Sequence, residues 1–297
     1  MDFIKKKWRV ITLAYLLASY LIFIVFMDKR TDYLTYAGLA FLVVTLILFV
    51  GTFIGMIGIM LHTVFKKEHL AMPFYRLAHS LGTTNINILA AYGVLLLKTF
   101  EPGEALTVFD KAKHLTGNYL YTKTLTGNIA LCHWKIGDPK KALETYEDLF
   151  YYPDLELITD YSEENLSEGK NKNGNFYAQD FVTMGYLALI NNQREKSRYY
   201  TQVALELSDK YGPAYDNLGQ LAYAEGNLKE AKEYFKKALE LKPGMIDSMY
   251  FLAKIAWDEG NIDDAKEKLQ AIDISKVNGL STVTADRINQ LKAKSAS

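Results

Sequence analysis

The side chains best suited to chemistry are five histidines and a single cysteine, Cys132. His62 and His69 are seven residues apart and can share one face of a helix, but two imidazoles without a third ligand make a poor metal site. Cys132 and His133 are neighbours, so on a helix they point about 100° apart and do not form a nucleophile–base couple. We therefore expect no catalytic residue, metal or cofactor, and we interpret Cys132 as a buried structural thiol.

Neither the motifs nor the charge indicate an enzyme or a nucleic-acid-binding protein. The 297 residues contain no glycine-rich phosphate loop, HExxH pair or GxSxG elbow. One cysteine excludes an internal disulfide. Residues 1–67 hold eight Lys/Arg against three acidic residues, whereas residues 68–297 hold 26 against 31. Such a mildly acidic body lacks the clustered Lys and Arg that neutralise phosphates, so we expect no nucleic-acid partner.

Two long uncharged runs, residues 10–27 and 33–65, dominate the N-terminal third. About 20 apolar residues cross a bilayer as a helix, so we expect a hairpin of two spans, about 10–27 and 34–62, in a domain of residues 1–67. A signal peptide is the alternative for the first run, but no small-residue cleavage pattern follows it. The basic flanks predict an integral protein of a bacterial cell membrane with both termini in the cytoplasm.

The second run carries a face of small residues, Gly51 and Gly55, extended by Gly58. Such a face lets another helix approach closely. Its partner is either the first predicted span or, in a homo-oligomer, a second copy of the chain. Neither run contains Asp, Glu, Lys or Arg, which ion pathways need, so we interpret the hairpin as an anchor in the lipid bilayer and not as a transporter.

The rest of the chain repeats at a spacing of 34 residues or slightly more. The best copy is residues 212–243. Its first predicted helix carries the small residue Gly219, and its second carries the small residues Ala231 and Ala238 with the large Phe235 between them. Each copy reads as two amphipathic helices that approach closely at the small residues. Between the helices, one column holds Gly137, Asn192, Gly226 and Gly260, residue types that tolerate the left-handed conformation that ends a helix.

These copies predict the domain organisation. No helix pair buries its apolar face by itself, so we expect the copies to stack into a solenoid over residues 84–274. Residues 68–83 form a half-repeat or stalk, and residues 275–297 hold a capping helix, 281–294, and a tail. The polar, Gly/Asn-rich stretch at 154–175 interrupts the spacing. We interpret it as an inert loop, with a lid over a binding site as the alternative.

The five copies resemble the tetratricopeptide repeat family. The resemblance implies an all-α fold in which the first helix of each pair lines a concave groove that binds extended peptides or helices of partner proteins. Carried over position by position, the residues suited to gripping a partner are Asn128, Trp134, Tyr186, Asn217, Gln220, Tyr223, Tyr250, Lys254 and Trp257. Large aromatic residues also fill the layers of solenoids, so a role in the core stays open for some of them.

One subgroup of this family clamps a C-terminal carboxylate with Lys, Asn and Arg. Only Asn128 and Asn217 resemble that cluster here, so we do not expect such a clamp. Other residue types stand at the remaining positions: Ala90, Val94, Thr183 and Asp247. Two hypotheses follow. The chain is a membrane-anchored scaffold or adaptor that binds protein or peptide partners at the cytoplasmic membrane face. Alternatively, it is a membrane-tethered sensor that closes on a peptide or similar ligand and signals through the hairpin, but we find no effector domain for it.

Overall fold

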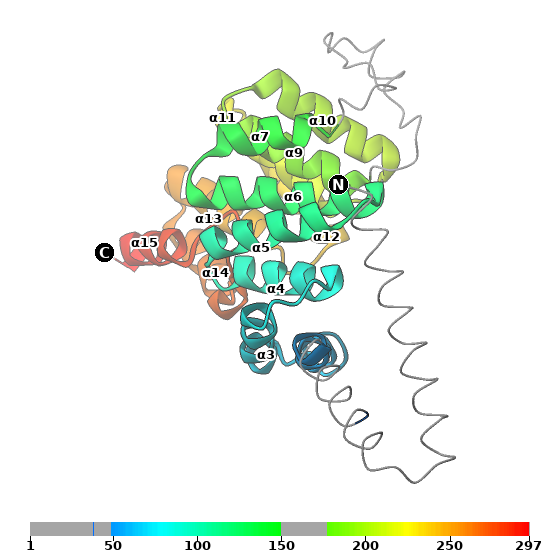
Figure 1. Cartoon of the computed structure of the whole chain (residues 1–297). Coiled ribbons are helices and arrows are strands. Elements are labelled where there is room, and N and C mark those ends of the chain that lie inside the picture. Colours follow the sequence, from blue (N-terminus) through cyan, green and yellow to red (C-terminus); the bar gives the residue numbers. More distant parts are fainter. Residues whose placement is uncertain (1–37, 39–48, 150–176, 297) are drawn as a thin grey trace. The chain divides into compact units, whose positions relative to one another are not determined.

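The structure is a computed structural model that describes residue 38 and residues 49–149 and 177–296. Within these residues the chain is helical, with short connections and no strand (Figure 1). It divides into two compact units, up to Ile88 and from Leu89 onward, which are described separately. The polar stretch predicted at 154–175 lies outside the described residues, so neither interpretation of it is tested.

From α4 onward, the described residues form five helix pairs and a last helix. The first helices of the pairs are α4 (Ile86–Lys98), α6 (Tyr119–Ile136), α9 (Ala178–Ile190), α11 (Gly212–Ala224) and α13 (Ile246–Asp258). The second helices are α5 (Pro102–Leu115), α7 (Pro139–Glu147), α10 (Arg194–Leu207), α12 (Leu228–Leu241) and α14 (Ile262–Gln270). Each of the second helices that is followed by another pair also packs against the first helix of that next pair. These second helices are α5, α7, α10 and α12. This all-helical, repeat-built solenoid confirms that part of the predicted fold class.

Small residues on the first helices face large residues on the second helices. An added Cβ atom at Gly93 would lie 2.6 Å from the ring of Phe109, and one at Gly219 would lie 2.7 Å from the ring of Phe235. Both rings are fully buried. Because a real Cβ does not fit at such distances, each glycine allows its helix pair to approach closely. The 34-residue spacing therefore reflects a contact between a glycine and an aromatic ring that recurs in the core of different pairs.

The left-handed turn between the helices of a pair recurs as the sequence predicts. Gly137, Asn192, Gly226 and Gly260 all have φ between 61° and 103°, which confirms that column. In the first pair Phe100 takes the turn, with a φ of 64° and a side chain that is 66 % exposed. Phenylalanine rarely adopts this conformation, so its residue type does not mark the turn.

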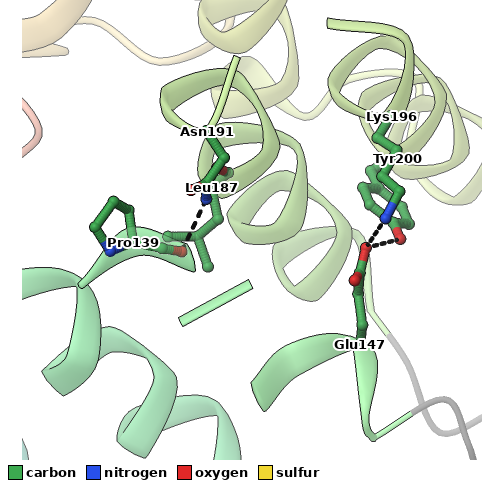
Figure 2. A network of polar contacts seen from close by, with 6 residues as sticks. All are labelled: Pro139, Glu147, Leu187, Asn191, Lys196 and Tyr200. Carbon is green, nitrogen blue, oxygen red and sulfur yellow. Dashed lines mark hydrogen bonds and ion pairs between the residues drawn. The ribbon is translucent and has the colours of Figure 1, made fainter. Parts of the chain in front are cut away.

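Side-chain contacts join the second pair to the third, on either side of the polar stretch. Asn191, directly after α9, donates its side-chain amide to the carbonyl oxygen of Pro139 at 2.8 Å. Lys196 and Tyr200 on α10 both donate to Glu147 Oε1, at 2.8 and 2.9 Å (Figure 2). These contacts fasten α7 to α9 and α10. The stack is therefore continuous where the spacing in the sequence is longer.

The first unit contains a helix pair of the same kind. Residues 49–59 form a helix that continues into a π-helical turn, η1 (Met60–Val64), and η1 contacts α3 (Glu68–Ser80). An added Cβ at Gly58 would lie 2.8 Å from the ring of Tyr75 on α3, which is the glycine–aromatic contact of the later pairs. The stretch between Gly58 and Tyr75 is one residue longer than the stretch between the glycine and the aromatic residue of the later pairs. A π-helical turn inserts one residue into a helix, and η1 lies between them.

The glycine face of this helix is covered within the first unit. An added Cβ at Gly51 would lie 3.3 Å from the carbonyl oxygen of Ala78, and one at Gly55 would lie 2.5 Å from the side chain of Ile88. The small residues therefore permit close contact with α3 and with the start of α4. A homo-oligomer through Gly51 and Gly55 is not supported.

The prediction of a transmembrane hairpin is contradicted. Among the helices that the structure describes, none combines the length and the apolar character needed to cross a bilayer. The predicted span at 10–27 lies outside the described residues, and of 34–62 only residue 38 and residues 49–62 lie within them. There, the apolar residues belong to one helix of a packed pair. The localisation that depended on the hairpin, a two-span protein of a bacterial cell membrane with cytoplasmic termini, is contradicted with it.

Candidate peptide-binding face

The side of the stack on which the first helices follow one another is named the first-helix face. Successive first helices contact one another, as α9 does α11 and α11 does α13. Trp134 on α6 and Tyr186 on α9 meet edge to face, with ring centroids 5.1 Å apart. The amine of Lys135 lies 3.6 Å from the centroid of the Trp134 ring. Both aromatic side chains are half-buried, so the structure places two predicted groove residues in one cluster.

A second cluster of predicted residues surrounds Asp258, at the end of α13. The hydroxyl of Tyr223 donates to Asp258 Oδ2 at 2.9 Å, and the amine of Lys254 forms an ion pair with the same carboxylate. Trp257 is half-buried and packs against the hydrophobic core of the last pairs. Tyr223 packs against the same core. These two aromatic residues therefore combine a core contact with a partly exposed surface.

The two amides predicted on α11 are buried inside the stack. Asn217 is 4 % exposed, and its amide donates to the carbonyl oxygen of Val182 on α9 at 2.7 Å. Gln220 donates to Asp216 Oδ2 at 2.7 Å. Asn217 therefore fastens α11 to α9, and Gln220 supports a neighbouring carboxylate. Asn128 on α6 is half-buried. That these residues bind a partner stays a prediction.

Two further carboxylates of the face, those of Asp216 and Asp247, lie on α11 and α13. Asp216 is buried and accepts hydrogen bonds from the Ser248 hydroxyl and the Gln220 amide. Burial, reinforced by the nearby Asp247 carboxylate, raises the pKa of Asp216 to about 7, although both hydrogen bonds oppose the rise. Burial also lowers the pKa of Lys135 to about 8, an effect that Asp247 partly offsets.

The chain's own residues 277–284 lie on the first-helix face. They connect η2 (Ile274–Lys276) to α15 (Ala285–Ala296), which packs against α13 and α14 (Figure 1). The last helix thus starts four residues later than the sequence predicts. The guanidinium of Arg287 lies 5.2 Å from the centroid of the buried Tyr250 ring on α13.

Side chains of two different pairs hold the main chain of this segment. Lys135 Nζ donates to the carbonyl oxygen of Ser281 at 2.7 Å. Asp247 Oδ1 accepts from the amide of Val283 at 2.8 Å and from the hydroxyl of Thr282. The face therefore holds a main-chain segment of its own chain through one cation and one carboxylate.

The same segment shows that the face is concave. The Gly279 amide donates to the carbonyl oxygen of Lys98, at the end of α4, at 3.0 Å. Only four residues further, Val283 is bonded to Asp247 on α13. Four residues span at most about 14 Å. In a flat row of helices about 10 Å apart, α4 and α13 would be about 40 Å apart, so the first helices must curve around the segment.

The side chains that looked reactive in the sequence have structural surroundings. Cys132 is fully buried, and burial, reinforced by the nearby Asp110, raises the pKa of its thiol to about 12. His62 Nδ1 lies 3.3 Å from the Tyr75 hydroxyl, and its Nε2 lies 3.5 Å from Glu68 Oε1. Across residues 49–149 and 177–296, no group of three or more His, Cys, Asp or Glu is placed to hold a metal.

Comparisons with known proteins agree with the stack of helix pairs. Residues 222–282 match the family described as "Tetratricopeptide repeat". PilW, a widely conserved type IV pilus biogenesis factor, is 16 % identical over 78 % of this chain and 97 % of its own, with a TM-score of 0.53. A thermophilic TPR protein in Thermus thermophilus is 17 % identical over 71 % and 97 %, with a TM-score of 0.50. No curated protein sequence matches the chain. The comparisons support the tetratricopeptide repeat family.

Several residues of this face lie outside the positions that the repeat pattern indicates. The repeat register places the aromatic residues on the first helices, but it does not indicate Lys135 or Asp216. Nor does it indicate that residues 277–284 fold back onto the face. The only local signal is the dipeptide Asn278–Gly279, which favours a turn.

Replacing Asp216 with asparagine is expected to make stability less dependent on pH. The folded chain holds the Asp216 proton up to about pH 7, whereas the unfolded chain releases it near the ordinary value of 3.8. The contribution of Asp216 to stability therefore falls as pH rises from about 4 to 7, because over that range only the unfolded state has lost the proton. The asparagine side chain would keep one acceptor for Ser248, and Gln220 can turn its oxygen towards the new amide.

The measurement is the urea midpoint of wild type, Asp216→Asn and an exposed control, Asp209→Asn, at half-unit steps from pH 5 to 8. The control is expected to follow the wild type. Parallel curves for wild type and Asp216→Asn would contradict the raised pKa.

Proposed function

We propose that this chain is a scaffold or adaptor that binds protein or peptide partners on its first-helix face. The observation that carries the proposal is that this face already binds a backbone. Lys135 holds the carbonyl oxygen of Ser281 and Asp247 holds the amide of Val283, so side chains of the second and fifth pairs bind the main chain of one segment. Main-chain groups are common to every peptide, so the same contacts suit a peptide partner.

The aromatic residues of the face supply the rest of such a site. Trp134 and Tyr186 lie together on neighbouring first helices, and Tyr223 and Trp257 lie further along the stack. Half-buried aromatic side chains are typical anchors of interfaces, because they bury a large area and lose little side-chain freedom. A peptide that crosses the face would therefore meet polar contacts for its backbone and apolar contacts for its side chains.

Substituting Trp134 with alanine is expected to weaken peptide binding about 30-fold, which corresponds to the loss of a hot spot worth about 2 kcal/mol. Peptides are first selected from a random display library on the purified full chain, and their affinities are then measured by calorimetry. Leu207→Ala is the control, because Leu207 lies at the end of a second helix and is 39 % exposed. A library that yields no binder, or binders that are indifferent to Trp134→Ala, would refute the proposal.

A further inference from the structure

The 277–284 segment reaches the first-helix face through a tight turn. The Ser281 amide donates to the Asn278 carbonyl oxygen at 3.0 Å, and the Asn278 amide donates to the Ser281 hydroxyl at 3.1 Å. Gly279, at the tip of this turn, is buried. An added Cβ there would lie 1.8 Å from the carbonyl oxygen of Leu97. The turn therefore fits the end of α4 only because this residue has no side chain.

Beyond the turn, the segment behaves like a bound peptide. Ser281 presents a carbonyl oxygen to Lys135, and Lys135 is itself stacked on the Trp134 ring. Thr282 presents its hydroxyl to Asp247, and Val283 presents its amide to the same carboxylate. The Val283 side chain is fully buried in the core of the last pairs. Each contact uses a group that a separate peptide chain can also supply.

Two of these contacts are selective. A carboxylate accepts hydrogen bonds but donates none when ionised, so Asp247 requires donors from its ligand. In the segment the side-chain donor is the Thr282 hydroxyl, so the matching ligand residue is Ser or Thr, and the next residue must have a free amide and an apolar side chain for the buried site. Proline is excluded at that second position because it has no amide hydrogen.

Resting on the proposed function, we propose that residues 277–284 are an intramolecular ligand that occupies the partner site, and that the partner is a peptide with Ser or Thr followed by an apolar residue. Such a partner replaces the segment at Lys135 and Asp247. A tethered segment acts at a high effective concentration, of millimolar order for short linkers. A partner therefore binds only if its affinity for the face is high enough to displace the tethered segment.

The test uses a fluorescent octapeptide with the sequence of residues 277–284 and the purified full chain, with binding followed by anisotropy. Gly279→Ala displaces the internal turn through the contact with Leu97, and we expect it to bind the octapeptide at least tenfold more tightly than the wild type. Gly117→Ala is the matched control, because an added Cβ at this exposed loop glycine meets no atom within 4 Å. This control is expected to bind like the wild type.

Two further variants test the chemistry of recognition. Adding Asp247→Asn to Gly279→Ala is expected to lower the affinity for the octapeptide at least tenfold. An octapeptide in which valine replaces the residue equivalent to Thr282 is expected to bind Gly279→Ala at least tenfold more weakly. If Gly279→Ala does not fold, as judged by its thermal melt, Thr282→Val in the chain loosens the segment without a new clash. This variant is expected to raise the affinity at least threefold.

Release of the segment is checked by hydrogen exchange at the Val283 amide, which is expected to be faster in Gly279→Ala. Equal octapeptide affinity in the wild type and in a variant with a released segment would overturn the inference. If library peptides still depend on Trp134 in that case, the proposed function stands. If neither the octapeptide nor any library peptide binds the chain, both this inference and the proposed function are refuted.

Discussion

Replacing Phe235 with alanine is expected to cost about 3–5 kcal/mol of unfolding free energy. The Phe235 ring is fully buried and stacks on Phe251, with centroids 5.3 Å apart and planes 7° from parallel. Its edge lies against Gly219, where an added Cβ would be 2.7 Å away. Alanine would leave a cavity bounded by helices of two repeats, because the glycine has no side chain to fill it.

The measurement is urea unfolding of the full chain followed by circular dichroism. Phe65→Ala is the control, because Phe65 is 54 % exposed, and its effect is expected to stay within about 0.5 kcal/mol. Gly219→Ala tests the contact from the other side and is expected to cost about 1–3 kcal/mol by overpacking. It should cost less in a Phe235→Leu background, where the clashing ring is absent. A neutral Gly219→Ala would contradict the contact.

The repeated core was readable because its determinants are local and periodic. Gly219 and Phe235 stand 16 residues apart, as do Gly93 and Phe109, and a close helix contact requires a small residue opposite a large one. The left-handed column was equally readable from glycine and asparagine. At Phe100 the same turn forms without such a residue, because the fixed helix pair on either side imposes it.

The N-terminal prediction failed because an apolar run carries no information on what covers it. Lipid and a neighbouring helix both favour Leu, Val, Ile and Phe, and a small-residue face suits both. In the described part, Gly58 meets Tyr75 as the repeat pattern requires. The π-helical turn η1 adds one residue between them and so hides the 16-residue spacing from a search of the sequence.

The first-helix face was predictable only in part. The register of the first helices indicated where Trp134 and Tyr186 lie, because each repeat presents the same positions to the same side. It did not indicate that Asn217 turns inward to the Val182 carbonyl, since an amide suits a ligand and a neighbouring helix equally. The contact between Lys135 and Ser281 joins residues 146 apart. No local pattern encodes such a pair, because it depends on the curvature of the whole stack.

Asp180→Ala is expected to cost about 3–5 kcal/mol of unfolding free energy, because it removes a carboxylate from a buried ammonium. Lys123 on α6 and Asp180 on α9 form an ion pair of 2.6 Å, and their side chains are 7 % and 19 % exposed. Asp180 Oδ2 also accepts from the Tyr177 amide at 2.8 Å, at the start of α9. The Lys123 amine lies 4.8 Å from the centroid of the Tyr177 ring. This group fixes the start of the third pair on the second.

Charge and packing are separated by a double variant measured with the same urea titration. Lys123→Met with Asp180→Leu removes both charges while keeping most of the volume, and it is expected to recover most of the stability that Asp180→Ala loses. Glu240→Ala is the control, because its pair with Lys237 is exposed on α12, at 48 % and 65 %, and should contribute at most about 0.5 kcal/mol. If Asp180→Ala and Glu240→Ala had the same small effect, water would have to reach Lys123, and the ion pair could not fix α9 on α6.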